Sequence, residues 1–162
     1  MFIITGLDPA PFARYFDLDA AALTALGARR VVADGPGYPC RVSLVDAHAG
    51  EELILCPYEH HAVTSPYRAS GPIFVRRAAT APAVHIDEVP PVLARRLLSV
   101  RAYDRAGDLV DAEVTPGAEL TAHITRLFAL DAVAYLHAHN ARPGCFAARV
   151  DRHPHRGARA SS

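Results

Sequence analysis

The sequence lacks lysine, glutamine and tryptophan entirely, so arginine alone carries its positive charge. Its 17 basic residues are balanced by 17 acidic residues, which gives a formal net charge of zero at pH 7. Basic residues cluster only near the end of the chain, at residues 149–159. The body of the chain therefore offers nucleic acid no electrostatic footprint, and we expect no nucleic-acid partner.

Cysteine is also scarce. The three cysteines, Cys40, Cys56 and Cys145, are an odd number without CxxC spacing. This pattern favours reduced thiols and argues against a zinc ribbon or a redox motif. Residues 1–12 lack a basic leader with a continuous apolar core, and no run approaches the roughly 20 apolar residues of a membrane helix. We expect a cytoplasmic protein with no membrane association.

The composition is that of a globular domain, with 162 residues of which 51% are hydrophobic. A chain of this length buries roughly 70% of its surface, enough for a core without disulfides or metal. We expect a single α+β domain over residues 1–152 and a flexible basic C-terminal tail over residues 153–162. No GxGxxG, Walker A or GxSxG pattern occurs, so dinucleotide, nucleotide triphosphate and hydrolase-fold functions have no support.

Short β-rich runs separated by turn residues dominate the pattern. Strands are predicted at residues 2–4, 29–33, 41–46, 53–56 and 73–76, with hairpins over 97–103 and 109–114 and over 133–139 and 146–150. In the first hairpin, Leu98, Val100 and Ala102 share one face, and we expect Val110, Ala112 and Val114 opposite them. These runs predict a mostly antiparallel sheet.

Helical signals are fewer. Asp19 is suited to cap a short helix that ends at Gly27, and Pro90 and Pro91 can open another. The clearest helix covers residues 118–128, with an apolar stripe formed by Leu120, Ile124, Leu127 and Phe128. The predicted fold is α+β, a mostly antiparallel sheet of short strands with one main helix packed on one face and a polar patch on the other.

Two histidines are candidates for a metal site. His137 and His139 are two residues apart on a predicted strand, so their side chains project from one face. First-row transition metals accept neutral imidazole, and further ligands could come from Glu59, His60 or His61. The alternative is that the two histidines are hydrogen-bonded polar residues on a half-exposed face.

A second candidate chemistry uses a thiol. Cys145 starts the strand that returns past His139, and a cysteine within reach of histidine can become a nucleophilic thiolate. Cys40 beside Arg41 is a weaker version, and Cys56 lies in an apolar run typical of a core. Free cysteine also occurs as a small buried hydrophobe, so both interpretations stay open.

A third candidate is a pocket for an anion. Arg41 and Arg101 lie in predicted strands, and Arg68 lies in the loop at residues 65–72. Guanidinium groups bind carboxylate or phosphate bidentately, so their convergence with His137 or His139 would suit a small anionic ligand. Each arginine could instead pair with an acidic residue on the surface. The candidate ligand-binding residues are Arg41, Tyr67, Arg68, Arg101, Tyr103 and Asn140.

Several segments together are similar to those of one family. They are PCRVSL at 39–44, YEH at 58–60, SPYR at 65–68, GPIF at 71–74, RAYD at 101–104 and HAHNARPGC at 137–145. In this order and spacing, the chain up to about residue 152 resembles a family of bacterial proteins called domain of unknown function 1203. The resemblance implies a bacterial, single-domain, cytoplasmic protein and supplies no reaction, substrate or cofactor.

The resemblance also places Arg41, Glu59, Arg68, His139 and Cys145 within the family's signature, which favours a site over a plain surface. We therefore predict a small enzyme or small-molecule-binding protein with an Arg/His/Cys-lined site for an anionic ligand, in which His139, Cys145 and Glu59 are the candidate catalytic residues. The alternatives are a non-catalytic structural or interaction protein, and a metal site at His137 and His139. The cofactor and the oligomeric state are not predicted.

One spatial hypothesis follows from these candidates. Arg68, Glu59, His139 and Asn140 all occur at predicted strand ends or in loops, where a rigid scaffold usually presents functional side chains. We expect the loop at residues 65–72 and the hairpin turn after His139 to lie beside each other over the polar face of the sheet.

Overall fold

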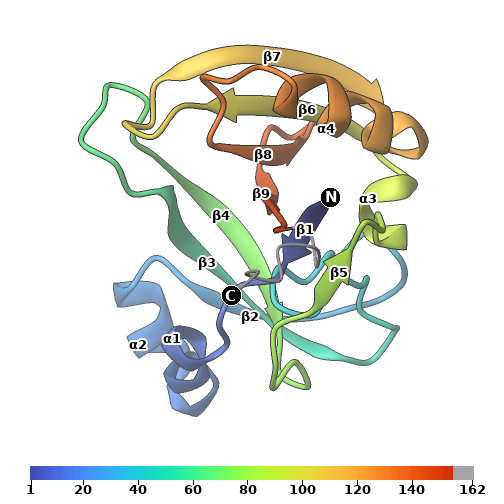
Figure 1. The fold of residues 1–162 in the computed structure, drawn as a ribbon. Helices are drawn as coiled ribbons and strands as arrows, with labels where there is room; N and C mark the ends of the chain where they lie inside the picture. The colour runs from blue at the N-terminus through green and yellow to red at the C-terminus, as the bar shows by residue number, and fades with distance from the viewer. Residues whose placement is uncertain (155–162) are drawn as a thin grey trace, which may run out of the picture.

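Two antiparallel sheets organise the chain in the computed structural model, which describes residues 1–154 (Figure 1). The six-stranded sheet A has the order β5-β1-β9-β8-β6-β7, and the three-stranded sheet B has the order β2-β3-β4. The strands of sheet A are β1 (Phe2–Thr5), β5 (Val84–Ile86), β6 (Leu97–Tyr103), β7 (Leu109–Pro116), β8 (Tyr135–Asn140) and β9 (Phe146–Arg152). The strands of sheet B are β2 (Arg29–Val32), β3 (Glu52–His61) and β4 (Ala69–Arg76).

The described helices are short and have local sequence causes. They are α1 (Ala10–Ala13), α2 (Ala20–Ala25), α3 (Pro91–Ala94) and α4 (Leu120–Phe128), with 3-10 turns at Arg14–Asp17 and Gly117–Glu119. The Asp19 side chain accepts a hydrogen bond of 2.8 Å from the Ala22 N–H at the start of α2. Gly27, at φ +69°, takes the left-handed conformation just beyond the end of this helix. The predicted cap and stop are confirmed.

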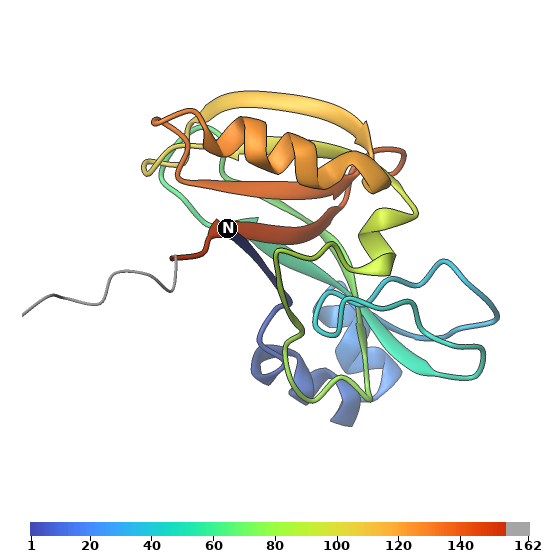
Figure 2. The same cartoon turned by 45° about the vertical axis from the view of Figure 1, so that its right-hand side comes forward.

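Helix α4 lies along one face of sheet A (Figure 2). Its Leu120, Ile124 and Leu127 are buried in a core shared with Leu98 of β6 and Leu136 of β8. The predicted apolar stripe therefore makes the contact with the sheet. Its fourth member, Phe128, is only partly buried against the same core.

A second apolar core holds sheet B to the N-terminal helices. Phe12 and Phe16 from the α1 region and Leu23 of α2 pack on Ile54 and Ile73 of the sheet. Figure 1 shows α1 and α2 beside sheet B, away from α4. The mostly antiparallel character of the fold is confirmed, but the prediction of one sheet with one main helix is not accurate. The sequence pattern of each short strand does not indicate which distant strand it pairs with, so the division into two sheets was not predicted.

Residues 41–46 form a turn, so the strand predicted there is wrong. Leu44 has φ +51°, and its N–H donates to the Cys40 carbonyl at 3.1 Å. The Cys40 N–H in turn donates to the Val45 carbonyl at 3.0 Å. Because the segment satisfies these backbone groups locally, it loops back instead of extending along a sheet.

The predicted core face of β7 is also wrong. Val100 lies opposite Glu113, and Ser99 lies opposite Val114, which is 60% exposed. The register shifts between Ala102 and Tyr103, and one extra residue in a hairpin moves alternate side chains to the other face. Ala112 and Val114 therefore share the face of Arg101 and Ser99, away from α4, and Val110 is the extra residue at the register shift.

Within residues 1–154, no helix is long and apolar enough to cross a membrane. Most of the predicted basic tail, from residue 155 on, lies outside the described residues.

Candidate functional site

A groove of about 900 Å³ opens where the turn between β8 and β9 faces the start of β4 and the loop that carries Arg41. We call it the arginine groove after the four arginines in its lining, Arg41, Arg95, Arg96 and Arg142. None of the described residues that line it is acidic. Its volume is within the range of small-molecule sites.

Arg41 forms part of the floor of this groove and is only 2% exposed. Its Nε donates to the Phe146 carbonyl at 2.7 Å, one Nη donates to the Pro39 carbonyl, and the other donates to Cys145 Sγ at 3.1 Å. Among residues 1–154, no carboxylate lies within ion-pair distance of it. Burial lowers the pKa of Arg41, and nearby Cys145 opposes this shift. Because arginine stays protonated in proteins, the guanidinium is a buried cation without an acidic partner among the described residues.

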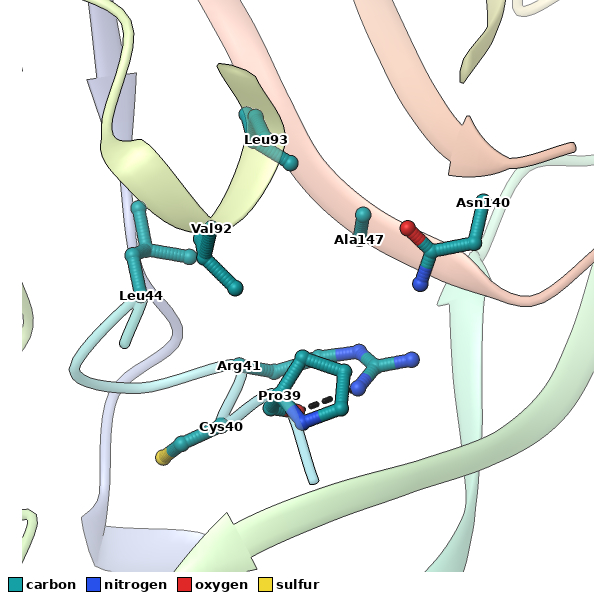
Figure 3. Close-up of a pocket in the computed structure, with 8 residues that line it drawn as sticks. All are labelled: Pro39, Cys40, Arg41, Leu44, Val92, Leu93, Asn140 and Ala147. Atoms are coloured by element: carbon teal, nitrogen blue, oxygen red, sulfur yellow. Dashed lines mark hydrogen bonds between the residues drawn. The ribbon is translucent and has the colours of Figure 1, made fainter. Parts of the chain in front are cut away.

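A second, much smaller cavity lies beside Arg41. It is bordered by Val92, Leu93 and Ala147 on one side and by Asn140 on the other (Figure 3). Its volume is about 10 Å³, which is at the lower limit for a single water molecule. Of these two adjoining cavities, the arginine groove is therefore the one with room for a ligand larger than water.

Cys145 is held at the groove by the hairpin turn. Gly144 has φ +80°, and its N–H donates to the Asn140 carbonyl at 2.8 Å, which fixes a tight turn before β9. The Asn140 side chain then donates from Nδ2 to Cys145 Sγ at 3.6 Å. Figure 3 shows the amide nitrogen of Asn140 facing the Arg41 guanidinium. Two N–H donors thus converge on one sulfur.

Four histidines gather where the end of β3 crosses sheet A. His137 and His139 of β8 project from the face opposite α4, and His60 and His61 of β3 cover them. The ring centroids lie 5.0 Å apart for His60 and His139 and 5.1 Å apart for His61 and His137. His60 also lines the arginine groove and therefore connects the two parts of the site.

The hydrogen bonding of these rings is unequal. Both ring nitrogens of His61 are hydrogen-bonded: Nδ1 donates to the Tyr67 carbonyl and Nε2 accepts from the Tyr135 hydroxyl, each at 2.8 Å. In contrast, one buried nitrogen on each of His60, His137 and His139 has no hydrogen-bond partner in the part of the chain that the structure describes. Buried polar groups usually have partners, so these nitrogens set the cluster apart from an ordinary core.

Burial favours the neutral form of three of these histidines, His60, His137 and His139. It lowers the pKa of His137 to about 2 and that of His139 to about 4, and it also lowers the pKa of His60. The hydrogen bond between His139 Nδ1 and the Gly144 carbonyl at 3.0 Å acts in the opposite direction. Neutral imidazole can accept a proton, accept a hydrogen bond or bind a metal. Over residues 1–154, however, no group of three or more His, Cys, Asp or Glu residues is arranged to hold a metal ion.

The structure separates the predicted site residues into three places. Arg41, Asn140 and Cys145 meet at the arginine groove. Arg101, Tyr103, His137 and His139 lie on the face of sheet A opposite α4. Glu59, Tyr67 and Arg68 lie on the hairpin between β3 and β4 and do not line the groove.

Arg68 and Glu59 pair with each other. Arg68 donates two hydrogen bonds of 2.8 and 3.0 Å to the two carboxylate oxygens of Glu59, and both side chains are exposed. Tyr67 is 45% exposed, and its backbone carbonyl accepts the hydrogen bond from His61 Nδ1. Of the loop at residues 65–72, only Ser70, Gly71 and Pro72 border the groove with the hairpin turn.

Sequence reasoning missed three arginines of the groove. Arg142 lies inside the HAHNARPGC segment, which could have indicated it. Arg95 and Arg96 follow α3 and carry no local signal. Arg96 forms an ion pair of 2.6 Å with Asp46, whereas neither Arg95 nor Arg142 has an ion pair among the described residues.

The comparisons with known proteins gave one match. A family model described as "Protein of unknown function (DUF1203)" matches residues 37–152, a range that contains every residue lining the arginine groove. No curated protein and no solved structure matches the chain.

Proposed function

The chain belongs to the DUF1203 family, and we propose that it binds a small anionic molecule in the arginine groove. The observation that supports this is the uncompensated positive charge of the groove. Arg41, Arg95 and Arg142 have no carboxylate partner among the residues described. A ligand with a carboxylate or phosphate group would supply the negative charge that these guanidinium groups lack, with Arg95 and Arg142 on the walls as its exposed donors.

The alternative is that Arg41 has a purely structural role. Its bonds to the Pro39 and Phe146 carbonyls tie the loop at residues 37–46 to β9, which stabilises the fold without any ligand. This role does not account for the exposed Arg95 and Arg142 on the walls of the same groove. Substitutions of these two wall residues therefore separate binding from folding.

The test is a calorimetric titration with inorganic phosphate and with citrate. We expect saturable binding that weakens with salt, and we expect Arg142→Ser and Arg95→Ser each to weaken it about tenfold, the effect of losing one charged hydrogen bond. Arg126→Ser is the matched control, since it removes the same charge from α4, where Arg126 pairs with Asp111. Absence of saturable binding, or equal weakening by Arg126→Ser, would refute the proposal.

A second candidate function is metal binding by His60, His137 and His139. The three partnerless nitrogens favour it, because neutral imidazole nitrogens are common ligands of zinc and nickel. Their present arrangement does not surround a metal, so the rings would have to turn on binding. Titration of tag-free protein with Zn²⁺ and Ni²⁺ against a chromophoric chelator tests this function. We expect the protein to bind one equivalent of metal and His139→Phe to lose this binding. No metal uptake by the unaltered protein would contradict the metal site.

A further inference from the structure

We propose that Cys145 is the reactive group of the arginine groove and that its sulfur attacks the electrophilic carbon of a small anionic molecule. This inference rests on the proposed function, because it gives the anion that binds in the groove a chemical class. The class is a compound with a carboxylate or phosphate group and a carbon that carries a leaving group.

The contacts of Arg41 are the first support. Its three hydrogen bonds go to two carbonyl oxygens and to Cys145 Sγ at 3.1 Å. Carbonyl oxygens cannot take up a full negative charge, so of these three described partners only the sulfur can carry a negative charge that the guanidinium would stabilise. A thiolate beside a guanidinium is the form of cysteine that acts as a nucleophile.

Asn140 is the second support. Its Nδ2 donates to the same sulfur at 3.6 Å, and the side chain is only 6% exposed at the edge of the groove. Its Oδ1 is buried and has no partner over residues 1–154. Figure 3 shows this oxygen turned toward Ala147 and the amide nitrogen turned toward Arg41, so the amide presents an N–H donor to the sulfur, which stabilises negative charge there.

The other two cysteines show what a structural thiol looks like in this protein. Cys40 and Cys56 are each 1% exposed and pack in the apolar core of sheet B. Burial raises the pKa of Cys56 to about 11, so it stays a thiol near neutral pH. Neither has a side-chain cation bonded to its sulfur, whereas Cys145 is partly exposed and bonded to Arg41.

The proposed step is a substitution at carbon. An electron pair of Sγ forms the carbon–sulfur bond, and the bond from that carbon to the leaving group breaks, with its electron pair departing on the leaving group. The negative charge passes from sulfur to the leaving group, so no oxidant or reductant is needed. Arg41 keeps a counter-charge throughout, first the thiolate and then the anionic group of the bound molecule.

Two alkylating reagents test the sulfur and the charge preference separately. Iodoacetamide and iodoacetate have the same reactive carbon and leaving group, but only iodoacetate is anionic. At pH 7 we expect peptide mapping to show that Cys145 is the first cysteine modified. We expect iodoacetamide to react with Cys145 at least about tenfold faster than it reacts with the cysteine of an uncharged peptide. The ratio of the iodoacetate rate to the iodoacetamide rate should exceed that of the peptide by about tenfold, the lower end of electrostatic steering effects.

Substitutions test whether the wall arginines cause the preference for iodoacetate and whether Asn140 contributes to the reactivity of Cys145. Arg95→Ser with Arg142→Ser should lower the iodoacetate rate about tenfold and leave the iodoacetamide rate within about twofold. Arg126→Ser should change neither rate. Asn140→Leu should slow both reagents, and it is preferred to substitution of Arg41, whose loss could unfold the chain. Circular dichroism checks that each variant is folded.

The outcomes separate this inference from the proposed function. If Cys145 reacts no faster than the peptide with either reagent, the inference is overturned, and the phosphate titration still decides anion binding. If iodoacetamide reacts fast but iodoacetate shows no preference, the anionic substrate class is overturned. Fast reaction with a preference that the paired wall substitutions abolish supports the inference.

Discussion

The two faces of strand β8 have opposite chemical character. Leu136 faces α4 and joins an apolar core, whereas the next residue, His137, faces the other way into a cluster of histidines and tyrosines. Both residues are almost completely buried, at 0% and 1% exposure. An apolar side chain gains free energy from this burial, while a polar atom without a partner loses it.

This difference shows where stability and function separate in the fold. Hydrophobic burial and packing explain the α4 face, apart from one buried nitrogen of His123 that has no partner among residues 1–154. The histidine face retains buried polar atoms that stability alone does not favour, and it adjoins a cationic groove with a partly exposed cysteine. Polar groups retained at such a cost are typical of functional sites.

The largest expected effect comes from the α4 face. Leu136→Ala removes a fully buried side chain from the main core, so we expect the free energy of unfolding to fall by about 2 to 5 kcal/mol. His137→Phe keeps a buried ring and removes a nitrogen without a partner, so we expect a change of less than about 1 kcal/mol. Urea denaturation at pH 7 measures both. A loss from His137→Phe as large as that from Leu136→Ala would mean that the histidine face also stabilises the fold.

The next effect is the response of the two faces to acid. The folded pKa values of about 2 for His137 and about 4 for His139 lie below the ordinary value of 6.5, so below pH 6.5 the unfolded chain binds more protons than the folded one. The contribution of the neutral imidazoles to the free energy of unfolding is therefore fully present above pH 6.5, and it is lost as the pH falls toward 4. Each imidazole contributes a loss of about 1.4 kcal/mol per pH unit.

Urea midpoints at pH 7, 6 and 5 measure this loss. His137→Phe should reduce the slope of stability against pH, because one of the three imidazoles whose pKa burial lowers is gone. Leu136→Ala should lower stability equally at every pH and leave the slope unchanged. An unchanged slope in His137→Phe would show that acid acts elsewhere in the molecule.

Local parts of the fold were predictable from the sequence because their causes are local. The Asp19 cap, the α4 stripe and the two hairpins all depend on residues close together in the chain. The division of the strands into two sheets depends on pairings such as β1 with β9, which no local pattern specifies. The bulge near Tyr103 reversed the expected face of β7, since a single extra residue changes the alternation.

The candidate site was predictable only as a set of residues. Arg41, Asn140 and Cys145 were each named, but the bond between Arg41 and Cys145 joins residues 104 positions apart, and its existence depends on the complete fold. The four-histidine cluster likewise requires β3 to cross β8. Arg95 reaches the groove only because α3 is placed beside the hairpin turn, so its sequence context gave no indication.

The smallest expected effect concerns the hairpin between β3 and β4. This hairpin is exposed to solvent, whereas both faces of β8 are covered. Arg68 and Glu59 are 58% and 38% exposed, so their ion pair is screened by water and salt. We expect Arg68→Ala to lower the free energy of unfolding by less than about 1 kcal/mol and this difference to vanish in 1 M salt. Because Arg68 does not line the groove, its loss should leave phosphate affinity within about twofold of the unaltered protein.

A double-mutant cycle of Arg68→Ala with Glu59→Gln isolates the energy of the pair, and the phosphate titration provides the second measurement. Arg142→Ser serves as the comparison, since it removes an arginine that does line the groove. If Arg68→Ala weakened phosphate binding as much as Arg142→Ser, the hairpin would have to move over the groove in the bound state. The sequence-based prediction of Arg68 as a ligand-binding residue would then hold, and the exposed hairpin would belong with the histidine face as part of the site.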